Sequence, residues 1–496
     1  MKSVLEIAGI AIPYADAVFV GGEWLRADEG RYAIVNPATE EVAAEVALPS
    51  RAHALAAVEA AHGQGQLLWS VLPVAERAAI CGRFCAALEE RLDDMGRLWA
   101  VEAGMPIGYS RIFHRYGAVA AWQAALAAAA AVLADQPRSS PLGDILIRRE
   151  PAGVLLAIMP YNGPLVMIGT KVLPALLAGC PVIVKAAVES QLIMRIVAQC
   201  AAQAGFPAGT ISFLCGDASI GQMLAEHPHV DMVSLTGGHV AAQAVIEATR
   251  GRFARTHLEL GGKSPALVLD DADIPAMLKS LVPGATNGTG QVCASLTRVL
   301  VSRGRHDEVV EAMRAAWQAL PIGDPLDPAT RIGPLATAAA RDRTERFVER
   351  ARQEGGRIVT GGQRPKAFPR GYYYEPTIVT GLSEEADLAR NEVFGPVTAV
   401  LTYTDVEDGI RMANNSSFGL AASVYTRDLK LAQRCAGAIR AGSVAINRFG
   451  PSVTEPFGGV RGSGWGREAG PEGILEFTEI KQIILDREET NLRKDG

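Results

Sequence analysis

Between Pro151 and Leu269, short apolar runs alternate with longer segments whose apolar residues recur at helical spacing. Glycine and proline turns separate the runs from these segments. The apolar runs are Val154–Met159, Pro181–Lys185, Thr210–Leu214 and Val230–Gly237. This alternation is typical of βαβ units, so it predicts an α/β fold with a doubly wound parallel sheet.

In sheets of this kind, ligands bind beyond the carboxyl ends of the strands. The residues at those ends are Asn162, which follows the first run, and Lys185, which closes the second. Gly237 and Gly238 stand at the end of the last run. We therefore expect these residues to line a ligand site.

A second stretch of α/β pattern runs from about Leu267 to Tyr425, without an internal repeat, a low-complexity linker or a long charge block. The chain has 496 residues, well above the roughly 250–300 residues at which a single core stops growing. Two or three domains are therefore expected.

The composition is near the average of folded soluble domains, with 49% hydrophobic and 21% charged residues. The net charge is −6, and the sequence has no Lys and Arg cluster of the kind that binds phosphate backbones. Nucleic acid is therefore not expected as a main partner.

The seven cysteines are scattered and form no C-x-x-C pair: Cys81, Cys85, Cys180, Cys200, Cys215, Cys293 and Cys435. Their odd number and their spacing favour neither a zinc site nor a disulfide framework. We predict a reducing, cytoplasmic location and no bound metal.

Two segments resemble export or membrane signals. The N-terminus has a basic Lys2, an apolar run and Ala-Asp-Ala at positions 15–17, but Glu6 interrupts the run, so a signal peptide is not favoured. The stretch from Gly117 to Ala134 is long enough to span a bilayer, yet it is mostly alanine, which gains little from lipid. A packed helix and no membrane partner are predicted.

Neither glycine-rich motif of the chain matches a phosphate-binding loop. The triplet Gly262–Ser264 has His257 where a nucleoside-triphosphate loop needs glycine, and the following Ala266–Leu269 indicates a strand, not a helix. Gly462–Gly466 has the wrong glycine spacing for a dinucleotide fingerprint and no preceding strand. Any dinucleotide cofactor is therefore held in another way.

The segment GTGQVCAS, from Gly288 to Ser295, places Cys293 among small residues, where the backbone can approach a ligand closely. This context suits a nucleophile. A lone cysteine is more often a small buried hydrophobe, and the six other cysteines fit that interpretation.

Further motifs stand in order around this segment: NPATEE at Asn36–Glu41, PYNGP at Pro160–Pro164, ELGGKSP at Glu259–Pro265, NEVFGP at Asn391–Pro396, PFGG at Pro456–Gly459 and FTEIK at Phe477–Lys481. Together they resemble the motifs of the aldehyde dehydrogenase superfamily, and the resemblance extends from about Phe19 to Lys481. It implies an NAD(P)-dependent enzyme that oxidises an aldehyde through a cysteine thiohemiacetal and a thioester.

The fold implied by this resemblance has a Rossmann-like cofactor-binding domain, an α/β catalytic domain and a small β bridging domain that builds dimers or tetramers. On this chain, the cofactor domain corresponds to 1–133 and 152–257, and the catalytic domain to 258–470. The bridging domain corresponds to 134–151 and 471–496. A homodimer or homotetramer is therefore expected.

The resemblance assigns catalytic roles to residues whose chemistry suits them. Cys293, as a thiolate, attacks the aldehyde carbonyl, and the Asn162 side-chain amide and the Cys293 backbone N–H stabilise the oxyanion. Glu259, held on a glycine turn, activates the water that hydrolyses the thioester. Lys171 and Glu468 match a proton path of the family, although a structural ion pair explains them equally well.

For the cofactor, the resemblance places Lys185 on the adenosine ribose and Glu392 on the nicotinamide ribose. Phe394 would back the nicotinamide ring.

Three departures from the family pattern bear on the cofactor. Val188 stands where many members have a ribose-binding glutamate, and Glu189 follows it. Gly238 stands in place of the serine that often follows Gly237, and Tyr161 in place of a tryptophan. A carboxylate at Glu189 could reach the ribose and repel a 2′-phosphate, so NAD is favoured and NADP is the alternative.

The residues after Asn162 indicate a wide substrate tunnel. Many members that favour small aldehydes carry large aromatic residues at the positions of Gly163 and Thr170. Aromatic, cyclic or long-chain aldehydes are therefore expected to react better than acetaldehyde.

Other residues bear on the same tunnel. Met167, Phe449 or Phe457 could refill the space from other walls. Arg448 could pair with a substrate carboxylate, or it could simply face solvent.

Two other functions stay open. Relatives that transfer the acyl group to coenzyme A typically lack a glutamate at the position of Glu259, so a free acid is the expected product. The same fold could also serve without turnover, as a structural or binding protein. The joint presence of Cys293, Glu259 and Asn162 argues against that function.

Overall fold

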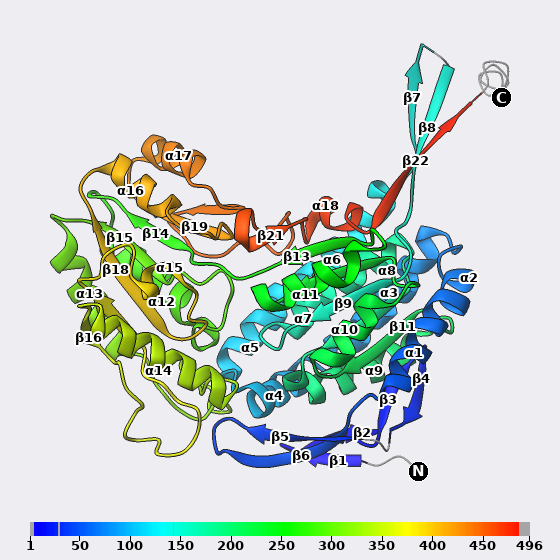
Figure 1. Cartoon of the computed structure of the whole chain (residues 1–496), viewed down its shortest axis with the longest axis horizontal. Helices are drawn as coiled ribbons and strands as arrows, with labels where there is room; N and C mark the ends of the chain where they lie inside the picture. Colours follow the sequence, from blue (N-terminus) through cyan, green and yellow to red (C-terminus); the bar gives the residue numbers. More distant parts are fainter. Residues whose placement is uncertain (1–3, 28–29, 142, 486–496) are drawn as a thin grey trace.

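The computed structural model describes residues 4–27, 30–141 and 143–485. Two lobes, each built around a mostly parallel sheet, lie side by side, and a β arm projects from one of them (Figure 1). Lys2 of the disfavoured signal peptide lies outside the described residues, as does the segment 486–496 of the predicted bridging domain.

The first lobe contains an eight-stranded sheet in the order β21-β13-β12-β9-β10-β11-β3-β4. Its strands are β3 (Ala17–Val20), β4 (Glu23–Arg26), β9 (Leu155–Met159), β10 (Val182–Ala186), β11 (Ile211–Cys215), β12 (Met232–Thr236), β13 (Arg255–Glu259) and β21 (Gly464–Trp465). Strands β9 to β13 are parallel, and from β9 the chain moves outward to β10 and β11 before it returns to β12 on the other side of β9. The predicted doubly wound parallel sheet is confirmed, with the predicted apolar runs as its strands.

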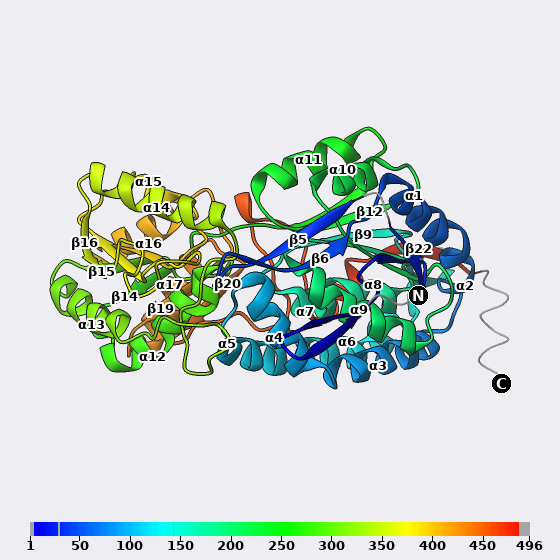
Figure 2. The same ribbon diagram turned by 90° about the horizontal axis from the view of Figure 1, so that it is seen from below.

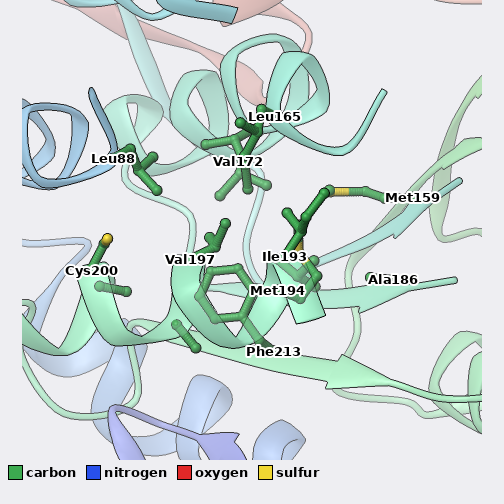
Figure 3. Close-up of a cluster of buried hydrophobic side chains, with 14 of the residues drawn as sticks. Leu88, Met159, Leu165, Val172, Ala186, Ile193, Met194, Val197, Cys200 and Phe213 are labelled. Carbon is green, nitrogen blue, oxygen red and sulfur yellow. The ribbon is translucent and has the colours of Figure 1, made fainter. Parts of the chain in front are cut away.

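Helices cover both faces of this sheet. One face packs against α3 (Val74–Glu89), α4 (Leu92–Ala103), α6 (Val119–Val132), α8 (Leu173–Ala178) and α9 (Gln191–Ala204). The other face packs against α1 (Arg51–Ala60), α10 (Ala218–Glu226) and α11 (His239–Arg250). Figure 3 shows part of the first core, in which Ile193 and Val197 of α9 lie near Phe213 of β11. Each such fully buried side chain stabilises the fold by roughly 1.5–3 kcal/mol.

The alanine-rich segment forms α6, as predicted. Trp122, Ala125 and Ala129 of this helix are buried against its neighbours. Small side chains allow a close approach of helices, which explains why an alanine-rich sequence suits this position. Over the described ranges of the chain, no helix combines the length and the apolar character needed to cross a bilayer.

The second lobe contains a seven-stranded sheet in the order β16-β17-β18-β15-β14-β19-β20, parallel except for β16. Its strands are β14 (Pro265–Val268), β15 (Arg298–Ser302), β16 (Arg357–Thr360), β17 (Thr377–Thr380), β18 (Val397–Tyr403), β19 (Ala421–Tyr425) and β20 (Ser443–Ile446). Its helices are α12 (Ile274–Thr286), α13 (His306–Gln318), α14 (Ala338–Gln353), α15 (Asp387–Arg390), α16 (Val406–Asn414) and α17 (Leu429–Ala438). The strand expected after the Gly262–Ser264 triplet is β14.

The projecting arm is a three-stranded antiparallel sheet of β7 (Gln136–Ser140), β8 (Gly143–Pro151) and β22 (Thr478–Ile484). Two hairpins near the N-terminus are formed by β1 (Val4–Ile7) with β2 (Ile10–Pro13) and by β5 (Arg31–Asn36) with β6 (Glu41–Ala47). The shorter helices are α2 (Gln66–Leu68), α5 (Ile107–Phe113), α7 (Pro164–Met167) and α18 (Gly470–Leu475). Strand β21 lies in the segment 258–470, which was assigned to the catalytic domain, and yet it pairs with β13 of the first lobe. The predicted domain limits stay a prediction.

The segment from Leu260 to Ser264 joins β13 of the first lobe to β14 of the second. Seen from below, the lobe that contains β9 and β12 and the lobe that contains β14 and β15 lie side by side (Figure 2). Strands β9, β10, β12 and β13 are parallel, so they all end at the same edge of the sheet, where β13 leads into this connection. Their carboxyl ends therefore face the junction. The candidate residues of the sequence therefore converge there.

Candidate active site

Glu259 is the last residue of β13, and the two glycines after it allow a close approach of neighbouring segments. A side chain added at Gly261 would place its Cβ 2.3 Å from Glu392 Oε2, and one at Gly262 would place it 2.7 Å from the Cys293 carbonyl oxygen. Only glycine fits at such contacts. The expected glycine turn is wrong, because residues 260–264 form no turn and neither glycine adopts a positive φ. The glycines instead bring three functional residues together.

Cys293 lies on a loop, Gly288–Ser295, that we call the cysteine loop. Its first three residues, Gly288, Thr289 and Gly290, all have left-handed φ values between 58° and 73°. For Thr289 this conformation costs of order 1–3 kcal/mol, so the surroundings must enforce it. The Thr289 hydroxyl donates to the Gly333 carbonyl at 3.2 Å and accepts from the Gly333 N–H at 3.1 Å, which anchors the loop.

Gln291, two residues before the nucleophile, is fully buried and holds the loop to its neighbours. Its Oε1 accepts from the Tyr161 hydroxyl at 2.9 Å and from the Ala336 N–H at 3.1 Å, and its Nε2 donates to the Gly288 carbonyl at 3.1 Å. Its backbone carbonyl accepts from Asn162 Nδ2 at 2.9 Å. Asn162 and Tyr161, both expected at the site, are therefore tied directly to the cysteine loop.

The Glu259 carboxyl group is buried beside Cys293. Its side chain is 2% exposed, and within the described ranges neither oxygen has a hydrogen-bond partner. Burial and the neighbouring Glu468 raise the pKa of Glu259 to about 8, against the opposing charge of Lys171. Burial and the carboxyl groups of Glu259 and Glu392 raise the pKa of Cys293 well above that of an ordinary thiol. Both groups therefore hold their protons at neutral pH.

Lys171 and Glu468 form a buried ion pair, with 2.5 Å between Nζ and Oε1 and side chains 0% and 1% exposed. Burial alone would raise the pKa of Glu468, but Lys171 holds it below its ordinary value. We call Glu259, Glu468 and Lys171 the carboxyl cluster. The structural ion pair, one of the two roles expected for these residues, is present. Their other expected role, the transport of protons, stays a prediction.

The residues expected around the cofactor lie at the ends of their strands. Lys185 is the next-to-last residue of β10 and is half-buried, and burial lowers its pKa. Glu189 lies in the short helix after β10, and a side chain added at Gly238 would meet no atom within 4 Å. The open space at Gly238, at the carboxyl edge of the sheet, suits a dinucleotide that approaches the backbone.

On the other lobe, Glu392 and Phe394 face the same junction. Glu392 Oε1 accepts from the Gly262 N–H at 3.1 Å, and burial raises the pKa of this carboxyl. Phe394 has a φ of 57°, and its ring stands edge-on to Tyr161 with 6.3 Å between centroids. A left-handed phenylalanine is a strained conformation of the kind that concentrates at binding sites.

The space beside Gly163 is bounded by an aromatic ring from another element. The nearest atoms to a Cβ added at Gly163 are Cε1 and Cζ of Phe113, at 3.7 and 3.9 Å. Phe113 stacks on Tyr109 and on Trp99, with centroid distances of 5.2 and 6.2 Å. A Cβ added at Gly288 of the cysteine loop would lie 3.5 Å from Tyr109 Cε1, so this wall extends from Gly163 to the cysteine loop.

Phe449 and Phe457, like Cys293, pack against a small apolar cluster of Ala294, Leu420 and Ala421. Met167 is half-buried and Thr170 is 4% exposed. Arg448 is exposed and lines a cavity of about 450 Å³ between β19, β20 and the loop after β20. Cys293 does not line this cavity. The substrate roles of these residues stay predictions.

Comparison with known proteins identifies the family. The model of the aldehyde dehydrogenase family matches residues 24–483. This chain belongs to the aldehyde dehydrogenase family. Membership confirms the predicted resemblance and the prediction of an enzyme of this class.

Among relatives, the geranial dehydrogenase of Castellaniella defragrans is 38% identical over 471 residues, which cover 94% of this chain and 98% of the relative. The crystal structure of a Mycobacterium tuberculosis aldehyde dehydrogenase complexed with NAD+ has a TM-score of 0.93 and 36% identity, with 95% and 98% of the two chains covered. A Pseudomonas syringae aldehyde dehydrogenase mutant, in complex with NAD+ and octanal, has a TM-score of 0.91 and 34% identity, with 95% and 97% covered.

Several residues of this aldehyde dehydrogenase site were absent from the sequence-based candidates. Gln291 lies inside the quoted GTGQVCAS motif, where a glutamine among small residues was a signal for a buried polar anchor. Tyr109 and Phe113 stand four residues apart, which places both rings on one helix face. Their position opposite Gly163 depends on tertiary packing, so no local signal could reveal it.

Proposed function

We propose that this protein oxidises a bulky, apolar aldehyde to the free carboxylic acid with NAD. The observation that carries the proposal is the buried Glu259 carboxyl beside Cys293, whose oxygens have no hydrogen-bond partner over the described residues. Such a pair supplies a nucleophile and a base in one enclosed space. The solved relatives bound to NAD+, one of them with octanal, and the relative named geranial dehydrogenase support the proposal.

Formation of the acyl-enzyme uses the cysteine loop. The Cys293 thiol first loses its proton to bulk water, and the thiolate then attacks the aldehyde carbon; the oxygen that becomes negative needs N–H donors nearby. We assign this role to the Cys293 N–H and to the Asn162 side-chain amide. One N–H of that amide is bonded to the Gln291 carbonyl; an amide nitrogen carries two, so the second is left for the oxyanion.

The residues at the junction fit a nicotinamide dinucleotide. Lys185 can donate to ribose hydroxyls from the first lobe, while Glu392, fixed by the Gly262 N–H, can accept from them on the second. Bound NAD supplies the hydride acceptor that turns the thiohemiacetal into a thioester. Glu189 places a carboxylate near the adenosine ribose, which disfavours the extra phosphate of NADP.

Hydrolysis of the thioester is assigned to Glu259. A water molecule next to the thioester gives its proton to this carboxylate as it attacks the carbonyl carbon, and the bond from that carbon to the Cys293 sulfur then breaks, which releases the acid and the thiolate. Once it is deprotonated, a carboxyl group with a pKa of about 8 is a stronger base than an ordinary glutamate. Transfer of the acyl group to coenzyme A is the alternative fate of the same thioester.

The substrate preference follows from the walls around Cys293. The absence of a side chain at Gly163 leaves room that Phe113 bounds with a flat ring, and Phe449 and Phe457 add apolar surface at the cluster that Cys293 also packs against. Flat or extended apolar aldehydes gain more from such walls than acetaldehyde does. One relative was solved with octanal, and another is named for geranial; both aldehydes are larger than acetaldehyde.

An aldehyde panel tests the function. Purified protein, NAD and each aldehyde are mixed, and reduced cofactor and acid are both quantified. We expect kcat/KM for long-chain or aromatic aldehydes to exceed that for acetaldehyde by more than about tenfold, since each buried methylene contributes ~1–3 kcal/mol. Equal or better use of acetaldehyde contradicts the substrate class. Formation of acyl-coenzyme A when coenzyme A is added contradicts the hydrolytic assignment.

A pair of variants tests the wall itself. Gly163→Phe alone forces its new ring against Phe113 and should reduce activity on bulky aldehydes while it spares small ones. Phe113→Ala restores the space, so the double variant should recover bulky substrates, with a coupling of about 1 kcal/mol or more between the two sites. Purely additive effects contradict the assignment of Phe113 to the substrate wall. The expected homodimer or homotetramer and the cytoplasmic location stay predictions.

A further inference from the structure

Two neighbouring strands carry polar residues in register on one face of the sheet. Parallel pairing of β12 with β13 places Ser234 opposite His257 and Thr236 opposite Glu259. The residues between them point to the opposite face, into an apolar core. Polar side chains inside buried strands are unfavourable unless they are hydrogen-bonded, so Ser234 and His257 need partners on this face.

These two residues continue the carboxyl cluster. Lys171 Nζ lies 2.9 Å from Ser234 Oγ and 2.5 Å from Glu468 Oε1, and Ser234 Oγ lies 2.7 Å from His257 Nδ1. An ammonium group only donates hydrogen bonds, so the Ser234 oxygen accepts from Lys171. The serine hydroxyl hydrogen is then free to donate to Nδ1 of a neutral imidazole. Glu468, Lys171, Ser234 and His257 thus form one hydrogen-bonded row.

The charge state of the row is set by its burial. Ser234 is 0% and His257 is 1% exposed. Burial and then the charge of Lys171 lower the pKa of His257 to about 3, so its ring stays neutral and can accept the serine proton. The other titratable or charged groups that face the row or Glu259 are Arg255, Arg467, Glu392 and Cys293. Lys171 is therefore the ammonium that offsets the two neighbouring carboxyl groups.

We propose that Ser234 and His257 are positioning residues for thioester hydrolysis. They hold the Lys171 ammonium against Glu468, which keeps its positive charge within reach of Glu259. The inference rests on the proposed hydrolytic function, since it concerns the base of that step. A merely structural role would affect folding stability and leave the pH dependence of hydrolysis unchanged.

The test compares two phases of the reaction across pH. Stopped-flow absorbance of reduced cofactor gives a burst for acyl-enzyme formation and a slower rate for hydrolysis. In Ser234→Ala, Lys171 loses one anchor, its charge stabilises the Glu259 carboxylate less, and more base is needed to deprotonate that carboxyl. We expect the pH midpoint of hydrolysis to move upward by about 0.5–1 pH unit while the burst amplitude is retained.

Two further variants separate this effect from a folding defect. His257→Leu removes the acceptor of the serine proton and should move the midpoint in the same direction. Ser234→Thr keeps the hydroxyl and should restore the original midpoint. Ser212→Ala is the matched control, because Ser212 is also a buried strand serine, 1% exposed, whose hydroxyl accepts from the Gly21 N–H at 2.8 Å. It lies on β11, which β9 and β10 separate from β12.

The outcomes are distinct. An unchanged midpoint in both Ser234→Ala and His257→Leu overturns the positioning role, as does an equal shift in Ser212→Ala. Loss of the burst in Ser234→Ala overturns it too, because acyl-enzyme formation would then depend on the row. Failure of the proposed function has another signature: the unmodified protein would oxidise no aldehyde or release no free acid.

Discussion

The cysteine loop and the carboxyl cluster hold their functional atoms in opposite ways. The cysteine loop is fixed by directional hydrogen bonds, through Thr289 on Gly333 and through the side chain and carbonyl of Gln291. In the carboxyl cluster, both oxygens of Glu259 and one of Glu468 have no hydrogen-bond partner in the described ranges, and charge sets their properties. A step that needs N–H donors at fixed points suits the first arrangement. A step that needs a free proton acceptor suits the second.

The largest expected effect comes from removal of the nucleophile on the loop side. Cys293→Ala should abolish aldehyde oxidation, because no other described cysteine is exposed to the site: the remaining six are buried elsewhere. Binding of NAD should survive, since the residues assigned to the cofactor are untouched. Absorbance of reduced cofactor and a calorimetric titration with NAD measure the two properties. Turnover at the original rate would refute the thioester mechanism.

Removal of the base acts on the other side of the comparison. Glu259→Gln should still release a burst of reduced cofactor and then turn over ~10²–10⁴-fold more slowly, as expected for loss of a general base in its own step. The acyl-enzyme should accumulate and be visible by mass spectrometry of the quenched protein. If the burst disappears with the turnover, Glu259 acts before hydrolysis.

Asn162→Ala weakens the loop side without removal of the nucleophile. Both acyl-enzyme formation and hydrolysis pass through an oxyanion at the same carbon, so both phases should slow, by ~10²–10³-fold each. This pattern differs from that of Glu259→Gln, where only the second phase slows. A normal burst rate in Asn162→Ala would show that other donors stabilise the oxyanion.

The smallest expected effect is a difference in pH dependence between acyl-enzyme formation, which depends on the cysteine loop, and hydrolysis, which depends on the carboxyl cluster. Glu259 acts in its deprotonated form and has a pKa of about 8, so hydrolysis should rise with pH up to that value and level off above it. Below it, each unit of pH lowers the rate about tenfold. The Cys293 thiol has a pKa well above its ordinary value, so the burst rate should keep rising at higher pH. Parallel profiles of the two phases would contradict separate control by Cys293 and Glu259.

The sequence predicted the elements that depend on local pattern. The apolar runs became β9, β10, β11 and β12, since a continuous buried run between turn residues has few other structures available. The motif residues Cys293, Glu259 and Glu392 meet at the junction of the lobes. Glycine alone was ambiguous: Gly261 and Gly262 were expected to turn the chain, but they serve close approach, and composition cannot distinguish these uses.

Contacts between distant segments were beyond local pattern. From the sequence, His257 was notable only because it stands where a phosphate-binding loop needs glycine. Its pairing with Ser234 depends on the register of two strands, and a slip by one residue would turn both side chains to the opposite face. Phe113 meets Gly163 only because α5 packs beside the segment after β9, which no spacing in the sequence encodes.

The backbone bridge between Phe457 and Glu468 has a practical consequence for the design of variant libraries. The two residues exchange two hydrogen bonds, each of 2.7 Å, so a residue of the apolar cluster around Cys293 and a residue of the carboxyl cluster share one rigid piece of chain. Exchange of the Phe457 side chain leaves that piece in place and can diversify the accepted aldehydes. Insertions or deletions in the loop that carries Phe457 would displace the Glu468 carboxylate as well. Selection for new substrates should therefore reward point substitutions at this position and eliminate length changes.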